Sequence, residues 1–185
     1  MAEIIDYMKE FNPWWDGKFK LEYKEREIYL KLKKILDMPQ IIALTGLRRV
    51  GKSTIMMKII EEHLSKGFNP KNIFLFSFDD LKKGDFRAVI RVYERVNKKD
   101  LSKEKFLFLF DEIQKIEGWQ EQIKIIYDLY KNNIKMIVSG SESLFIRKRS
   151  KESLAGRIFE FKVDTLTFKE FTKFKGVSYD SVELY

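Results

Sequence analysis

The segment from residue 46 to residue 54 has glycines, a lysine and hydroxyl residues at a spacing that suits phosphate binding. It fits the pattern G-x-x-x-x-G-K-[ST] and lies between an apolar run and a helical pattern. Glycines let successive backbone N–H groups turn toward phosphate oxygens, and the N-terminus of the following helix adds a favourable dipole. We expect Lys52 to reach the terminal phosphates of a nucleotide and the Ser53 hydroxyl to reach Mg²⁺. The predicted binding set also contains Gly46, Arg49, Val50, Gly51 and Thr54.

Two adjacent carboxylates follow the phenylalanine-rich run at 106–110. Asp111 and Glu112 therefore stand at the carboxyl end of a predicted buried strand. Beside a phosphate loop, one carboxylate can hold the hydration shell of Mg²⁺ and a second can accept a proton from an attacking water. We predict Asp111 for the metal and Glu112 for catalysis. The alternative is that the pair caps the next helix.

Ser141 follows the run at 135–138, the fourth predicted strand. A polar side chain at this strand end points toward the cleft where a γ-phosphate would lie. Ser141 can equally serve as the N-cap of the following helix. Asp79, at the end of the second predicted strand, is left out of the predicted site because a turn or a helix cap explains it.

Short apolar runs alternate with helical patterns along the chain, which favours the α/β class with a mostly parallel sheet covered on both faces. Strands are predicted at 41–44, 73–78, 106–110, 135–138 and 158–163. Helices are predicted at 21–36, 52–64, 86–96, 119–130 and 142–149, with weaker helical spacing at 4–11 and 168–174.

Length and composition set further bounds. The chain has 185 residues, 44% of them hydrophobic, which suits one folded domain and excludes general disorder. The formal charge of +8 suits an anionic partner, such as a nucleotide, nucleic acid or a membrane surface, or is a solvated lysine-rich surface. No cysteine and a single histidine, His63, exclude disulfides, thiol catalysis and zinc clusters.

The chain contains no run near the roughly 18 consecutive apolar residues of a membrane-spanning helix. Residues 1–10 carry acidic groups and only a short apolar stretch, unlike a secretory signal. We therefore expect a soluble protein of the cytoplasm, with no membrane partner.

Taken together, the motifs resemble the archaeal-type P-loop ATPases of the AAA-related superfamily, which are related to the STAND class of signalling NTPases. The resemblance covers most of the chain. It is carried by Asn12-Pro13-Trp14-Trp15, the phosphate loop, Asp111-Glu112-Ile113-Gln114 with Trp119, Ser139-Gly140-Ser141, Leu154-Ala155-Gly156-Arg157, and Leu166-Thr167-Phe168-Lys169-Glu170-Phe171.

The resemblance implies a three-layer P-loop NTPase fold with five strands in the order 5-1-4-3-2. It also implies an ATP-hydrolysing core that uses ATP and Mg²⁺, with Ser141 near the sensor position. We expect an N-terminal helical and aromatic segment, 1–38, packed on a core at 39–185. Such ATPases usually continue into a helical lid, and we expect this chain to end before a lid or a C-terminal domain.

Arg157 stands where such a protein can place an arginine that reads the γ-phosphate, in the same chain or from a neighbouring subunit. A surface turn or an ordinary ion pair is the competing interpretation. Similarly, Trp14 and Trp15 precede the first strand, in the region that helps to form the adenine pocket, although ordinary packing also explains them. Trp119 is interpreted as a core residue.

These residues are compatible with three functions. The first is a Mg²⁺-dependent ATPase that couples hydrolysis to an unidentified protein partner or a homo-oligomer. The alternative is a nucleotide-operated switch or scaffold with little turnover. A kinase fits less well, because the acidic pair suits activation of water. Binding of nucleic acid is compatible with the charge, yet no motif for it is present.

Overall fold

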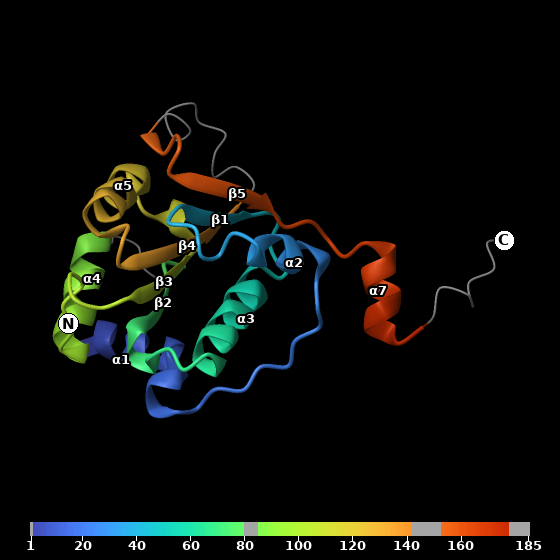
Figure 1. The fold of residues 1–185 in the computed structure, drawn as a ribbon, viewed down its shortest axis with the longest axis horizontal. Helices are drawn as coiled ribbons and strands as arrows, with labels where there is room; N and C mark the ends of the chain where they lie inside the picture. Colours follow the sequence, from blue (N-terminus) through green and yellow to red (C-terminus); the bar gives the residue numbers. More distant parts are fainter. Residues whose placement is uncertain (1, 80–84, 142–152, 178–185) are drawn as a thin grey trace.

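Five parallel strands form one sheet in the computed structural model, which describes residues 2–79, 85–141 and 153–177. The sheet order is β2-β3-β4-β1-β5, and all four neighbouring pairs are parallel. This confirms the α/β class and the order 5-1-4-3-2 (Figure 1). The strands are β1 (Ile41–Thr45), β2 (Ile73–Ser77), β3 (Phe106–Asp111), β4 (Ile134–Gly140) and β5 (Ile158–Lys162).

Helices lie on both faces of the sheet, which completes the three layers (Figure 1). Helices α4 and α5 pack on one face, and α2 and α3 pack on the other. The helices are α1 (Ala2–Phe11), α2 (Glu27–Lys33), α3 (Lys52–Ser65), α4 (Phe86–Asn97), α5 (Trp119–Tyr130) and α7 (Phe168–Lys175). Short 3₁₀ turns are η1 (Pro13–Asp16), η2 (Pro70–Asn72) and η3 (Ile113–Lys115). The helix predicted at 142–149 lies outside the described residues.

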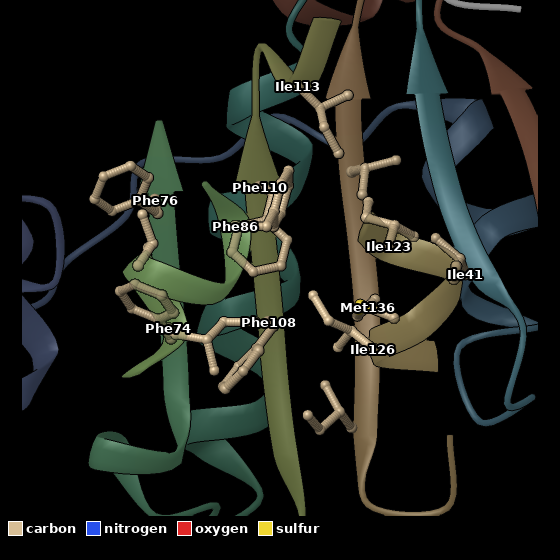
Figure 2. Packing of buried hydrophobic residues seen from close by; sticks show 14 of the residues in the cluster. Ile41, Phe74, Phe76, Phe86, Phe108, Phe110, Ile113, Ile123, Ile126 and Met136 are labelled. Atoms are coloured by element: carbon tan, nitrogen blue, oxygen red, sulfur yellow. The ribbon is translucent and has the colours of Figure 1, made fainter. Parts of the chain in front are cut away.

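Successive residues of a strand point to opposite faces of the sheet and pack into two separate hydrophobic cores. In β3, Phe108 and Phe110 face α4 and α5, whereas Leu107 and Leu109 face α3. Figure 2 shows the phenylalanine side of this packing, where the Phe110 ring meets the Phe86 ring of α4 edge to face at 4.7 Å. Both faces are covered, so the strand is apolar along its whole buried length rather than alternating. The neighbouring Trp119 lies in the same core, as predicted.

The free edge of β2 is closed by side chains of the N-terminal segment. The Asn12 amide accepts from the Leu75 N–H at 2.7 Å and donates to the Leu75 carbonyl at 2.8 Å. The Tyr7 hydroxyl donates to the Ser77 carbonyl at 3.1 Å. These are backbone groups that another strand would otherwise pair, so Asn12 acts as a short substitute for a strand.

Trp14 and Trp15 belong to the same edge. Both indole N–H groups donate to the Ile73 carbonyl, at 3.1 and 2.8 Å. Ile73 is the first residue of β2, whereas the phosphate loop follows the last residue of β1. The carboxyl ends of parallel strands lie together at one end of the sheet, which carries the phosphate loop. The tryptophans therefore lie toward the opposite end, where the strands begin. Packing, and not a place at the adenine, therefore explains this pair.

The helix predicted at 21–36 is wrong over its first part. Residues 18–26 have no regular structure, and α2 begins only at Glu27. Arg26 has an extended backbone, and its side chain is bound to three distant parts of the chain. These contacts hold the segment open where its own spacing favours a helix.

Candidate nucleotide-binding site

The phosphate loop leaves β1 at Thr45 and enters α3 at Lys52. It therefore lies between a central strand and the N-terminus of a 14-residue helix, as the motif requires. A hollow of about 610 Å³ opens beside it. The hollow is lined by Arg48, Arg49, Gly51, Lys52, Ser53, Thr54 and Glu112.

Positive backbone φ angles curl this loop. Gly46 has φ +147°, Arg49 +65° and Gly51 +98°. A Cβ at Gly46 would lie 2.3 Å from the carbonyl oxygen of Val163, in the chain that leaves β5. Only glycine fits there, because this neighbour is backbone and cannot rotate aside.

Lys52 folds back over the loop that it follows. Its residue is 6% exposed, and its Nζ donates to the carbonyls of Gly46 and Leu47 at 3.0 and 2.8 Å. An ammonium group has three N–H donors, so these two bonds leave one for a phosphate oxygen. The predicted lysine is thus already oriented by the loop.

Asp111 connects β3 to the phosphate loop. Its Oδ2 accepts from the Ser53 hydroxyl at 2.7 Å, and its Oδ1 accepts from the hydroxyl of Ser139. Phe110 pairs with Val138 across β3 and β4, so the next residues, Asp111 and Ser139, are neighbours. The sequence analysis chose Ser141 from Ser139-Gly140-Ser141 and gave Ser139 no role, although aligning the ends of the two strands would have indicated it.

These oxygens suit Mg²⁺. Within the described ranges, no group of three or more histidine, cysteine or acidic residues could enclose a metal. Mg²⁺ does not need such a cage, because it usually keeps several waters and binds one or two protein oxygens together with phosphate. The pair of Ser53 and Asp111 fits that donor set.

Glu112 lines the hollow from the turn after β3. Its backbone is left-handed, with φ +53°, a conformation that costs energy in a residue other than glycine. The Gln114 amide donates to its carboxylate. The Oε1 of Gln114 is buried and has no hydrogen-bond partner among the described residues. Gln114 belongs to a segment that carries the family resemblance, but the sequence analysis gave it no role at the site.

The rim of the site includes Asp79, which sequence reasoning left out. Its carboxylate lies 3.6 Å from Arg48 of the loop and 3.4 Å from Lys115 of η3. All three side chains are at least 40% exposed, so these ion pairs contribute little to stability. They do connect the loop to the turn that carries Glu112.

Ser141 lies at the carboxyl ends of the strands, beside the phosphate loop. Ser141 directly follows β4, whose Gly140 pairs with Thr45 at the start of the loop. It is half-buried at the same edge of the sheet as the phosphate loop.

Arg157 lies at the opposite end of the sheet, where the strands begin. Its carbonyl accepts from the N–H of Ile41, the first residue of β1, whereas the loop follows the last residue of that strand. The intervening strand rises by roughly 13 Å at about 3.3 Å per residue. The guanidinium pairs with Asp128 of α5 at 2.9 Å. The fold therefore does not bring Arg157 to the phosphate loop of its own chain.

With this geometry in place, a family model described as an AAA domain matches residues 38–172. The chain belongs to this AAA domain family. The matched range begins just before β1 and ends within α7, so it contains the sheet, the loop and the acidic pair. Helices of the described part of the chain are too short or too polar to cross a membrane.

Two curated relatives are similar to this chain in sequence. An uncharacterized protein of Haemophilus influenzae is 31% identical over 163 residues, which is 84% of this AAA domain chain and 39% of that protein. An uncharacterized protein of Methanocaldococcus jannaschii is 32% identical over 137 residues, 73% of this chain and 28% of that protein. The chain thus spans less than half the length of either relative.

Solved structures share the fold. The Saccharomyces cerevisiae Hsp104–ADP complex matches with a TM-score of 0.55 and 15% identity, over 94% of this chain and 26% of that one. The Hsp104–casein complex in an extended conformation matches with a TM-score of 0.59 and 16% identity, over 90% and 32%. These likenesses support the AAA arrangement of strands and helices.

Proposed function

We propose that this AAA domain binds and hydrolyses ATP with Mg²⁺ and couples its nucleotide state to a protein partner. The observation that carries the proposal is the 2.7 Å hydrogen bond between Ser53 of the phosphate loop and Asp111 of β3, beside Lys52 and Glu112. The same edge of the sheet thus holds a cation for the phosphates, oxygens for a metal, and a separate carboxylate.

Each group has a distinct proposed role. The loop N–H groups and Lys52 bind the phosphates, while Ser53 and Asp111 hold Mg²⁺. The metal would neutralise charge on the phosphates. Glu112 accepts a proton from the attacking water, and Ser141 contacts the γ-phosphate.

A second hollow, of about 580 Å³, adjoins the loop and supports a place for the base. Its lining includes the apolar surfaces of Tyr23, Val50, Leu166 and Phe174. It is the more apolar of the two hollows beside the loop, and a purine ring buries mainly apolar surface. We place the adenine here, and not at Trp14 and Trp15.

A nucleotide-operated switch with little turnover is the second candidate. It is favoured by the place of Arg157, which is bound to Asp128 away from the phosphate loop. Without an arginine delivered from elsewhere, charge developing on the phosphates has less stabilisation. A cytoplasmic location and a partner in the form of a protein or a second copy of the chain complete the proposal.

The test measures phosphate release from Mg²⁺-ATP and nucleotide binding on the same samples. We expect Lys52→Ala to lose both, and Glu112→Gln to keep binding while turnover falls by about 100-fold or more. Unchanged hydrolysis in Glu112→Gln would exclude this residue as the base. Binding without phosphate release in the wild type would favour the switch.

A further inference from the structure

Arg26 joins three parts of the chain through one guanidinium group. Its Nη1 donates to the Val50 carbonyl in the phosphate loop at 2.9 Å, and its Nη2 donates to the Asp164 carbonyl after β5 at 3.0 Å. Its Nε donates to Glu170 of α7 at 2.9 Å. The Arg26 side chain is 10% exposed and that of Glu170 is 6% exposed, so both charges are buried.

The contact with Val50 fixes the direction of the next backbone N–H group, that of Gly51. A trans peptide is planar, and its C=O and the following N–H point in opposite directions. The chain has no cis peptide bond among the described residues. Because Arg26 holds the Val50 carbonyl, the N–H of Gly51 must point away from Arg26. Gly51 lines the hollow beside Lys52 and Ser53, so this N–H is among the donors expected to meet a phosphate.

The contact with Glu170 fixes the start of α7. One carboxylate oxygen of Glu170 accepts from Arg26 and from the Glu27 N–H, and the other accepts from the Thr167 N–H at 3.0 Å. Burial alone would raise the pKa of Glu170, but these hydrogen bonds, that of Arg26 foremost, hold the pKa below its usual range. The carboxylate is therefore charged at neutral pH and completes the capping box of α7.

Helix α7 stands beside the sheet layers rather than between them (Figure 1). Its Phe168 and Phe171 are 56% and 47% exposed. Its other ion pairs, Lys169 with Glu27 and Lys173 with Glu25, are on the exposed surface. Phe174, near the end of α7, lines the hollow proposed for the adenine, so a nucleotide can also contact this helix directly. The buried pair of Arg26 and Glu170 is the contact that joins the start of α7 to the phosphate loop.

We propose that Arg26 is a positioning residue of the phosphate loop, and that its pair with Glu170 couples nucleotide occupancy to the orientation of α7. The inference rests on the proposed binding of nucleotide. Coupling is reciprocal, so whatever fixes α7 also changes the affinity of the loop. A partner that holds α7 would thereby adjust nucleotide binding without touching the nucleotide.

The first test is the affinity of the full chain for Mg²⁺-ATP, measured by titration calorimetry well below the unfolding temperature. Arg26→Lys keeps the charge but loses the fork that serves three acceptors, and Glu170→Gln keeps the shape but removes the counter-ion. We expect each to weaken binding by about tenfold, the usual effect of one charged hydrogen bond.

Lys169→Ala is the matched control. It breaks an exposed ion pair between α7 and the same N-terminal segment, so we expect its affinity to change by less than about twofold. Arg26 also lines the hollow proposed for the adenine, whereas Glu170 does not, so Glu170→Gln separates positioning of the loop from direct contact with the base. If Glu170→Gln binds as tightly as Lys169→Ala, the buried pair does not position the loop. The proposed function would survive that result. A wild type that binds no nucleotide would overturn both.

The wild-type arm of the second test needs no variant and can overturn the coupling by itself. A response in α7 is assigned to the buried pair only if Glu170→Gln loses it, because Phe174 of α7 lines the hollow proposed for the adenine. Hydrogen exchange of the α7 amides is measured in the wild type with and without Mg²⁺-ATP. We expect nucleotide to change exchange at 168–175 as well as at the loop, and Glu170→Gln to lose only the α7 response. Unchanged exchange at α7 with a protected loop would overturn the coupling.

Discussion

Asp111 is the central residue of the proposed Mg²⁺ site, because each of its carboxylate oxygens accepts a hydrogen bond from a different serine. Ser53 belongs to the phosphate loop and Ser139 to β4. A bound Mg²⁺ would take oxygens from Ser53 and Asp111, which leaves Ser139 to keep the carboxylate in its orientation. Outer partners of this kind commonly change metal affinity or activity by about 10- to 100-fold.

Ser139→Ala is therefore expected to raise the Mg²⁺ concentration needed for half-maximal phosphate release by about tenfold. The measurement is turnover as a function of Mg²⁺ at saturating ATP. Ser141→Ala is the comparison, because a group that contacts the γ-phosphate should lower turnover at saturating Mg²⁺ without shifting the Mg²⁺ midpoint. An unshifted midpoint in Ser139→Ala would show that Asp111 needs no second hydroxyl.

At the scale of elements, the middle of the β2 edge depends on a single side chain, because Asn12 pairs both backbone groups of Leu75. Asn12 is 1% exposed, and its side chain makes three hydrogen bonds, two with Leu75 and one with the Met8 carbonyl. Because it pairs both backbone groups of Leu75, its loss leaves a buried donor and a buried acceptor unpaired. An open edge of this kind also offers a template for another strand.

We expect Asn12→Ala to lower the free energy of unfolding by about 3 kcal/mol and to promote aggregation. Denaturant unfolding and light scattering measure the two effects. Asn69→Ala is the control, since the Asn69 side chain accepts one exposed hydrogen bond, from the Lys71 N–H, and its loss should cost under about 1 kcal/mol. Asn12→Asp should also destabilise, because a carboxylate cannot donate to the Leu75 carbonyl.

Elements whose signal is local could be predicted from the sequence. The strand β3 and the phosphate loop each carry their own pattern, an apolar run or a glycine-lysine motif, and the parallel order agreed with the family resemblance. The helix predicted at 21–36 was wrong at its start because Arg26 is held by groups more than 20 residues away. Ser139 was missed for the same reason, since strand register and not sequence spacing places it beside Asp111.

At the scale of the whole molecule, the two ends of the parallel sheet carry different groups of the predicted site. The carboxyl ends carry the phosphate loop, Asp111 and Glu112, whereas the amino end of β5 carries Arg157. Arg157 and Asp128 form an exposed ion pair, which is readily exchanged for another anionic partner. An arginine placed so far from its own site can act on a nucleotide only in a neighbouring copy of the chain.

This arrangement predicts complementation between two inactive variants. Arg157→Ala keeps Glu112 but lacks the arginine, and Glu112→Gln keeps the arginine but lacks the base. Each alone should release little phosphate, whereas a mixture should recover activity, because Glu112→Gln chains supply Arg157 to intact sites in their neighbours. Phosphate release as a function of mixing ratio and total concentration is the measurement.

Asp128→Asn is the control, because it frees Arg157 from its ion pair without removing it. If Arg157 acts between copies, this variant should keep or raise turnover, and turnover per wild-type chain should increase with concentration. If mixtures stay as inactive as their components while the wild type hydrolyses ATP at a rate independent of concentration, Arg157 serves only its pair with Asp128. Turnover then depends on groups at the carboxyl end of the sheet, of which Arg48 and Arg49 already line the hollow.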